Sequence, residues 1–423
     1  YFYIECPFAN EFQVFWGENT CCTREELREI TDEEALIDWT QTSNLALQRG
    51  KTARETIQIL GALIEEYGLR GCGESYLVSD PNEAWVMEIP GGTRQWVAAR
   101  CPDDQVCIHA NRMRICEIDL DDPDNFMASP KLIQLAIDKG FYNPETDGPF
   151  CFEKVYNPDE GREDWGNRRR EWRMLSLLAP SKEWDPNAIQ YPLGVKPDEK
   201  VSVQWWINNV WRDYMKGTPF DLTKGFPAGP FGCPERPSIE EASFERPISY
   251  QWTAYSWVSQ ARANLPDPIG GVAWFAFDQP ASSCYVPFYV GITDTPKSWR
   301  DGDFTEFSED SARWWFQALD NYSCLRFNEM NADARAVFDS IEADSFAMQP
   351  YIEKIALELY KTDPALCEDF LTRYSSRRAL EAEAAARDLF HSLLAKYADG
   401  APSATVSETW MQIFKLYEPR ELP

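Results

Sequence analysis

The sequence predicts an α+β fold, because strand patterns and helix patterns come in separate blocks along the chain. Aromatic and β-branched runs that are typical of strands occupy residues 2–16 and 75–109, and a second block covers 250–289. From about residue 312 the pattern is helical to the end. Blocks of this kind are typical of layered α+β proteins rather than of alternating βαβ units. We therefore expect a mixed domain over 1–311 and a helical region over 312–423 that packs on it.

The first elements follow from short local signals. Residues 2–5 and 12–16 predict two strands, with a polar turn at Asn10-Glu11 between them. Residues 52–67 predict a helix, since apolar residues recur at helical spacing, Thr52 and Glu55 fit a capping box, and Gly68 stands at the expected end.

Four strand patterns then follow one another with turns between them, which predicts an antiparallel meander. They cover 75–78, 84–89, 95–99 and 106–109.

The middle of the chain, 120–240, is irregular and rich in Pro, Asp and Trp, with a loop at 224–232. Helical patterns interrupt it at 129–139, 166–178 and 202–216. Three more strands are predicted at 250–260, 270–277 and 284–289. The clearest later helix covers 377–397.

Charge and hydropathy exclude several classes of partner. The chain of 423 residues carries a net charge of -28, which disfavours nucleic acid and anionic membranes. No run of eighteen apolar residues is present, so no transmembrane helix is predicted. We therefore expect no nucleic-acid partner and no membrane span.

Metal and cofactor motifs are absent from the sequence. The two histidines, His109 and His391, do not form a His-rich site, and none of the twelve cysteines has zinc-ribbon or C-x-x-C spacing. We expect no cofactor and no metal. The cysteines fit either several disulfides in an oxidising compartment or buried free thiols, and the spacing does not decide between them.

Few groups in the sequence fit nucleophilic catalysis through histidine. No G-x-S-x-G elbow, H-E-x-x-H motif or phosphate loop is present. Cys72 lies between two glycines but has only Arg70 as a basic neighbour, which favours an ordinary loop cysteine. One hydrolytic mechanism needs no histidine, because the first residue of the mature chain is the nucleophile and its α-amine, with a pKa of about 7.7–8.0, is the base.

Five segments, in order, resemble the dipeptidase A and secernin-like family of cysteine N-terminal-nucleophile hydrolases. Together they extend over much of the chain, so they carry more weight than any single motif. They read NEFQVFWGENTC at 10–21, GESYLV with EAWVME at 73–78 and 83–88, HANRMRI at 109–115, GTPFDLTKG with AGPFG at 217–225 and 228–232, and ERPIS with LPDPIGGV at 245–249 and 265–272.

The resemblance implies a four-layer αββα sandwich over 1–311 that hydrolyses dipeptides, with 312–423 as a helical C-terminal extension. It also implies an N-terminal cysteine nucleophile several tens of residues before the Asn10-Glu11 stretch. We therefore expect the domain to lack its first strands here, and the nucleophile to lie in an upstream segment or a separate chain. Family members often assemble, so a homo-oligomer is expected.

Three residues are predicted to be catalytic. Asn19 stands where related hydrolases have an oxyanion-binding asparagine, and a turn-forming role is the alternative. Asn111 follows a predicted strand inside the third segment, and the alternative is local capping of the backbone. Arg246 is the second residue of the fifth segment, where a cation would lower the pKa of the nucleophilic thiol or form a salt bridge.

Two residues are predicted to bind substrate. Glu18 is a candidate for the free substrate amine, with Glu88 as a weaker one, although most such carboxylates are only solvated or paired. Arg112 is a candidate for the substrate carboxylate through its planar fork, and pairing with an acid of the chain is the alternative.

The leading hypothesis is thus a cysteine dipeptidase whose nucleophile lies upstream of Tyr1. A catalytically inactive relative with a structural or binding role is the alternative, and an amidase or acylase is a third. The sequon Asn321-Tyr322-Ser323 and the cysteine count favour secretion or a lysosome-like compartment.

Overall fold

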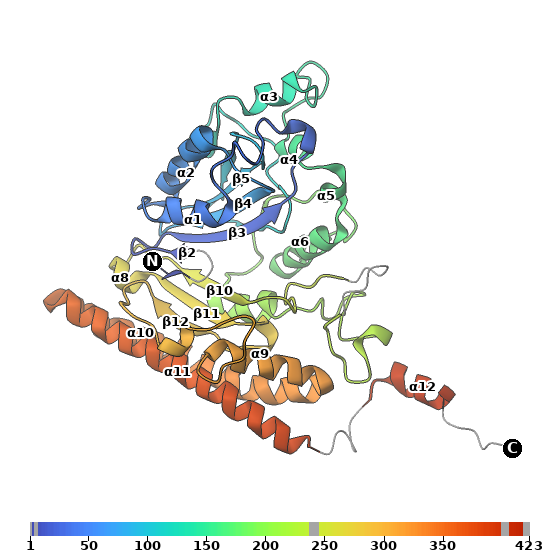
Figure 1. Ribbon diagram of the computed structural model, residues 1–423, viewed down its shortest axis with the longest axis vertical. Coiled ribbons are helices and arrows are strands. Elements are labelled where there is room, and N and C mark those ends of the chain that lie inside the picture. The colour runs from blue at the N-terminus through green and yellow to red at the C-terminus, as the bar shows by residue number, and fades with distance from the viewer. Residues whose placement is uncertain (1, 4–6, 237–244, 399–405, 418–423) are drawn as a thin grey trace. The chain divides into compact units, whose positions relative to one another are not determined.

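The structure, a computed structural model, describes residues 2–3, 7–236, 245–398 and 406–417 (Figure 1). Its contacts divide the chain into two compact units. Unit 1 consists of Tyr1–Val201 and Ser259–Val272, and unit 2 of Ser202–Val258 and Ala273–Pro423. Helices and sheets occur in separate blocks, as the α+β prediction requires.

Unit 1 is built on a seven-stranded sheet with the order β1-β2-β3-β4-β5-β6-β8. The neighbouring strand pairs from β2 to β8 are antiparallel, and β4, β5 and β6 are the first three strands of the predicted meander. The strands are β1 (Phe2–Tyr3), β2 (Pro7–Ala9), β3 (Phe15–Cys21), β4 (Gly73–Ser79), β5 (Ala84–Ile89), β6 (Val97–Arg100) and β8 (Phe126–Ala128).

Two helices cover one face of this sheet. The helices α1 (Trp39–Leu47) and α2 (Ala53–Tyr67) share a buried apolar core with side chains of β3, β4 and β5. Trp16 and Tyr76 belong to this core, and their rings lie 4.6 Å apart. The opposite face has its own core, which includes Cys21 and packs against α3 (Leu132–Asp138) and α4 (Phe152–Tyr156). The two cores therefore identify the two faces of the sheet.

The predicted helix over 52–67 is confirmed by α2. The Thr52 side chain accepts a hydrogen bond from the Glu55 backbone N–H, as an N-cap should. In a capping box the Glu55 side chain would accept a hydrogen bond from the Thr52 N–H. Here it accepts from the N–H of the preceding residue, Lys51. Gly68 ends the helix with φ of 71°, a conformation that favours glycine.

Other predictions in unit 1 need correction. The strand expected at 12–16 begins at Phe15 and continues to Cys21, because β4 pairs with it along its whole length. The fourth strand expected in the meander is wrong: β7 (Val106–Cys107) pairs with β9 (Gly194–Val195) in a separate ribbon, and β8 takes the place beside β6. The helix α1 was not predicted at all.

Gly91 lies where two backbone segments pass each other. A Cβ atom there would stand 2.2 Å from Gly71 O and 2.4 Å from the Cys72 carbonyl carbon, so the backbone would have to move. We expect Gly91→Ala to lower the free energy of unfolding by about 1–3 kcal/mol. Chemical denaturation measures this. Gly17→Ala is the matched control, since its Cβ meets nothing closer than 3.7 Å. Equal losses for the two variants would contradict the argument.

Unit 2 combines a three-stranded sheet with long helices. Its strands have the order β10-β11-β12, and the helices α10 and α11 contact β12. Asp363 separates the two helices and caps the second of them, accepting from the Ala365 and Leu366 N–H groups. The bounds are β10 (Tyr255–Gln260), β11 (Val272–Phe277), β12 (Val286–Tyr289), α9 (Ala312–Ser323), α10 (Phe327–Thr362) and α11 (Pro364–Lys396).

The remaining helices are short. The helical pattern at 202–216 is shorter than predicted, because α7 ends at Trp206 and a π-helical turn ends at Trp211. None of the helices described is both long enough and apolar enough to cross a membrane. The others are α5 (Asp159–Glu163), α6 (Trp165–Leu178), α7 (Val203–Trp206), α8 (Asp267–Gly270) and α12 (Glu408–Tyr417).

The boundary predicted after residue 311 falls inside unit 2, directly before α9. The region after it is helical as expected, and its helices α9, α10 and α11 contact one another. The chain passes from unit 1 to unit 2 earlier, after Val201. Residues 259–272 belong to unit 1, although the segments before and after them belong to unit 2.

Candidate functional site

The end of β3 carries the first candidates, and the strand geometry separates them. Side chains alternate between the two faces of a strand, and the pairing of β3 with β4 is regular from Phe15 to Cys21. Trp16 points to the core under α1 and α2, so Glu18 lies on that face. Cys21 points to the opposite core, so Asn19 lies there. Glu18 and Asn19 were predicted for one site, but they lie on opposite faces of the sheet.

Glu18 belongs to a small acidic cluster. Its Oε1 accepts a hydrogen bond of 3.1 Å from Thr20 Oγ1. Burial, together with a hydrogen bond and the charge of Glu18, raises the pKa of Glu74 to about 10. Glu74 is therefore protonated at neutral pH, and its side chain is hydrogen-bonded to that of Glu18. Glu18 is the residue that was predicted from the sequence to bind the substrate amine.

The pKa of Glu74 predicts how stability depends on pH. A carboxyl whose pKa is higher in the folded than in the unfolded state stabilises the fold at low pH, and this contribution falls as pH rises from about 4.5 to about 10. We expect Glu74→Gln to remove a slope of up to about 1.4 kcal/mol per pH unit in this window. Denaturation at several pH values measures it. The exposed Glu26→Gln is the control, and an unchanged slope in Glu74→Gln would contradict the assignment.

Asn19 lies opposite Ser75 on β4, and Ser75 in turn lies opposite Glu88 on β5. Among the residues that the structure describes, the Asn19 side-chain amide makes no hydrogen bond, and the side chain is half-buried. A half-buried amide donor without a partner is what an oxyanion site requires before substrate binds.

Ser75, His109 and Glu88 resemble a catalytic trio but are arranged differently. His109 Nε2 lies 2.6 Å from Ser75 Oγ and 3.0 Å from Glu88 Oε1, while Nδ1 lies 2.6 Å from Ala110 O. In a triad the serine and the acid contact different nitrogens of the ring. The His109 and Glu88 side chains are fully buried. This placement favours a structural role for His109.

Glu88 is also occupied by the backbone. Its carboxylate accepts hydrogen bonds from Arg114 N–H at 2.5 Å and from Ile115 N–H at 3.1 Å. These bonds hold the segment after β7 against the sheet. Binding of a substrate amine by Glu88 has no support in this geometry.

Asn111 lies next to the end of β3. Its Nδ2 donates to Thr20 O at 3.1 Å, and its Oδ1 accepts from the Arg170 guanidinium at 3.0 Å. Its backbone N–H and C=O both pair with the Asn167 side chain, at 3.2 and 3.0 Å. The structure thus brings Asn111 to the residue after Asn19, with its side-chain nitrogen and oxygen both hydrogen-bonded. This geometry is suited to positioning β3 rather than to contacting a reacting atom.

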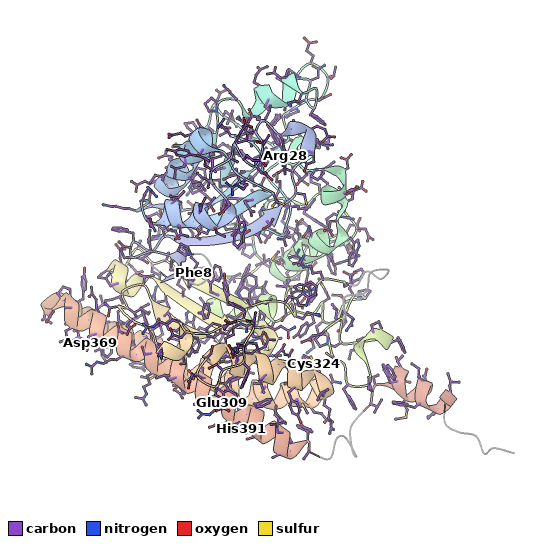
Figure 2. All side chains as sticks on the ribbon, viewed as in Figure 1. Phe8, Arg28, Glu309, Cys324, Asp369 and His391 are labelled. Carbon is purple, nitrogen blue, oxygen red and sulfur yellow. A yellow bond between two sulfur atoms is a disulfide. The ribbon has the colours of Figure 1, made fainter. Side chains whose placement is uncertain are left out.

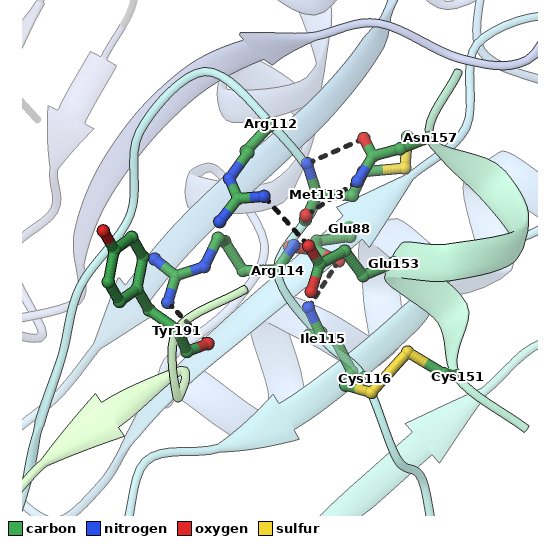
Figure 3. The surroundings of a disulfide bond; sticks show 10 residues. All are labelled: Glu88, Arg112, Met113, Arg114, Ile115, Cys116, Cys151, Glu153, Asn157 and Tyr191. Atoms are coloured by element: carbon green, nitrogen blue, oxygen red, sulfur yellow. Dashed lines mark hydrogen bonds and ion pairs between the residues drawn. A yellow bond between two sulfur atoms is a disulfide. The ribbon is translucent and has the colours of Figure 1, made fainter. Parts of the chain in front are cut away.

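Arg112 is buried and paired inside unit 1 (Figure 3). Its guanidinium donates to both Glu171 oxygens, at 2.8 and 2.6 Å, and to Glu153 at 2.9 Å. Burial pushes the pKa of Glu171 upward, but Arg114 and Arg112 outweigh it and hold that pKa below its usual range. Burial raises the pKa of Glu153 to about 7 despite Arg112. Of the two roles considered for Arg112, the structure shows the pairing with acidic residues of the chain. The guanidinium edge that would bind a substrate carboxylate is occupied by Glu171.

A disulfide supports the same segment. Cys116 and Cys151 are bonded, and Cys151 directly precedes α4 (Figure 3). Directly after this helix, Asn157 exchanges two hydrogen bonds with the Met113 backbone, at 3.2 and 2.9 Å. The segment that carries Asn111 is therefore fixed by a covalent bond, by ion pairs and by backbone contacts. No pairing of these two cysteines was predicted.

Arg246 belongs to unit 2, so it is not placed relative to Asn19 or Asn111. Its guanidinium lies 4.6 Å from the centre of the Tyr250 ring. Its Nε is buried and has no hydrogen-bond partner within the part of the chain that the structure describes. The predicted action of Arg246 on a nucleophilic thiol stays a prediction.

The cysteines of unit 1 near β3 are not activated nucleophiles. Burial raises the pKa of Cys21 well above its usual value, with Glu88 and Glu74 adding to the effect. Partial burial and the neighbouring Cys72 raise the pKa of Cys22. A thiol must ionise to attack, so raised pKa values disfavour both as nucleophiles.

Unit 1 also has a cleft of about 530 Å³, bordered by Arg114, Tyr191 and Cys107. None of the predicted site residues lines it, so the cleft and the candidate site are separate features.

Comparisons with known proteins identify the family. The model of peptidase family C69 matches residues 5–339. The chain therefore belongs to peptidase family C69, which confirms the resemblance found in the sequence.

Several curated bacterial relatives are named dipeptidases. A probable dipeptidase of Latilactobacillus sakei is 31% identical over 277 residues, which cover 65% of this chain and 55% of the relative. A probable dipeptidase B of Lactococcus lactis is 32% identical over 260 residues, or 61% of this chain and 52% of the relative. Dipeptidase A of Lactobacillus helveticus is 28% identical over 252 residues, or 59% and 49%. These alignments span about half the length of the relatives.

Proposed function

We propose that the complete protein is a cysteine dipeptidase whose nucleophile is an N-terminal cysteine outside residues 1–423. Membership of peptidase family C69 and the names of its relatives support the class of reaction. In this proposal the free α-amine of the nucleophile is the base, since an α-amine titrates near neutral pH. A four-layer αββα sandwich is proposed as the fold of the hydrolase domain.

The observation that carries the proposal is the environment of the Asn19 side-chain amide. Its amide is half-buried and unpaired among the described residues, while Asn111 bonds to the next carbonyl of the same strand. In the proposed mechanism Asn19 donates to the oxyanion of the tetrahedral intermediate, and Asn111 is a positioning residue that holds the end of β3. Arg246 as a modulator of the thiol is a further part of the proposal, whereas Glu18, on the opposite face of the sheet from Asn19, is given no role in it.

A non-catalytic relative is the competing function. The observation that favours it is the complete engagement of Asn111 and Arg112 in contacts within the chain. A catalytic asparagine and a substrate-binding arginine would both need free donors.

An oxidising compartment, such as the secretory pathway, is proposed for the folding of this chain. The Cys116–Cys151 disulfide supports this proposal, because disulfides are rare in reducing compartments.

An activity assay on the complete protein tests the function. A panel of free dipeptides is incubated with the enzyme, and N-acetylated dipeptides of the same sequence are the controls. We expect release of both amino acids from the free dipeptides only, and loss of activity after treatment with a thiol alkylator. No hydrolysis of any dipeptide by correctly processed protein would favour the non-catalytic function. Preference for acetylated substrates would favour an amidase or acylase.

A further inference from the structure

Three groups that ligate metals or oxidise lie together in unit 2. The sulfur atoms of Cys233 and Cys324 and a carboxylate oxygen of Glu235 are all within 4.8 Å of one another. Cys233 follows the loop at 226–232, and Cys324 begins the short helical turn between α9 and α10 (Cys324 is labelled in Figure 2). Both cysteines are half-buried, so small molecules in solvent can reach them.

Backbone contacts bring these cysteines together. The Asn328 N–H donates to Phe231 O at 3.1 Å, which joins the loop to the first turn of α10. Gly232 packs so closely there that a Cβ atom would meet Asn328 Oδ1 at 2.6 Å. The Cys233 N–H donates to Ala228 O at 2.8 Å. The sulfur atoms are thus held near each other by the fold rather than by a single side-chain rotamer.

The two thiols differ in acidity. A hydrogen bond from Cys324 lowers the pKa of Cys233, while the same bond and burial raise the pKa of Cys324. The thiol with the lower pKa is the attacking group in thiol–disulfide exchange. Cysteines of this chain also oxidise elsewhere, since Cys116 and Cys151 form a disulfide.

We propose that Cys233 and Cys324 form a second disulfide, which fastens the loop at 226–232 to the start of α10. The oxidant is a small-molecule disulfide. The Cys233 thiolate attacks one of its sulfur atoms and releases the first small thiolate, leaving a mixed disulfide on Cys233. Cys324 then loses its proton and attacks the Cys233 sulfur, which releases the second small thiolate. Two electrons pass to the small disulfide, and the two cysteine protons end on the two small thiols.

The proposed disulfide would restrain a segment that resembles the peptidase family. The segment at 217–232 resembles the family, and its last residue directly precedes Cys233. The cross-link closes a ring of about 90 residues, and rings of that size lose much conformational entropy in the unfolded chain. The inference is independent of the proposed catalytic activity.

Peptide mapping under non-reducing conditions tests the proposal. The full chain is exposed to oxidised glutathione, remaining thiols are alkylated, and the digest is analysed by mass spectrometry. We expect a cross-linked peptide pair containing Cys233 and Cys324 that disappears on reduction. Two alkylated thiols at these positions would overturn the proposal. So would one equivalent of bound zinc with both thiols released only by a chelator, which would assign a Cys233–Glu235–Cys324 metal site instead.

Thermal unfolding of serine variants gives an independent measure. In the oxidised protein, Cys233→Ser and Cys324→Ser should each lower Tm by roughly 5–10 °C, and the double variant should lower it no further. In reductant, each variant should match the equally reduced native sequence within about 2 °C. Additive losses in the double variant, or equal losses with and without reductant, would overturn the disulfide.

Discussion

Asn19→Ala in the complete enzyme is expected to lower kcat on dipeptides by about 10²–10³-fold, with little change in KM. The proposed reason is that the Asn19 amide donates to the oxyanion, which exists only in the transition state and its neighbouring intermediate. Steady-state kinetics on one good dipeptide measures the effect.

Asn82→Ala is the matched control, because Asn82 is an exposed asparagine in the turn between β4 and β5. It should change kcat less than threefold. A similarly small change for Asn19→Ala, or a rise in KM without a loss of kcat, would contradict the proposed role.

Arg112→Met is expected to lower the free energy of unfolding by about 3–5 kcal/mol. Arg112 is buried and donates to two buried carboxylates, Glu171 and Glu153. Removing the cation takes the closest positive charge from both carboxyl groups, and the Arg114 guanidinium does not replace its hydrogen bonds. Urea denaturation followed by tryptophan fluorescence measures the loss.

Arg373→Met is the control for this prediction, since its ion pair with Asp369 is largely exposed and should contribute less than about 1 kcal/mol. Arg112→Lys keeps the charge but loses the two-pronged contact with Glu171, so an intermediate loss is expected. If Arg112→Met cost no more than Arg373→Met, the buried ion pairs would not hold this segment in place.

Caps, turns and residue periodicity predicted the helices and strands whose formation depends on neighbouring residues in the sequence. The helix α2 was predicted with its cap at Thr52, and β4, β5 and β6 were predicted as the first three strands of a meander from turns and strand patterns. The helix α1 was missed, although Asp38 and Gln41 form a capping box at its start. The strand β7 was assigned to the wrong sheet, because its partner β9 lies far along the chain and nothing local marks the pairing.

In the candidate site too, contacts between residues that are distant in sequence could not be predicted. That Glu18 and Asn19 lie on opposite faces follows from strand alternation and could have been inferred from the sequence. The partners of Arg112 could not, because Glu153 and Glu171 are distant in sequence and acids are abundant throughout the chain. The Cys116–Cys151 bond was equally hidden, since twelve cysteines allow many pairings.

The most direct test of the proposed function identifies the residue whose alkylation abolishes activity. The purified complete protein is treated with one equivalent of a thiol alkylator until dipeptide hydrolysis stops, and the label is mapped by mass spectrometry. We predict that the label lies on an N-terminal cysteine outside residues 1–423, in proportion to the activity lost. A label on Cys22 or Cys72 that tracks the loss of activity, or full activity after every accessible thiol is labelled, would contradict the account.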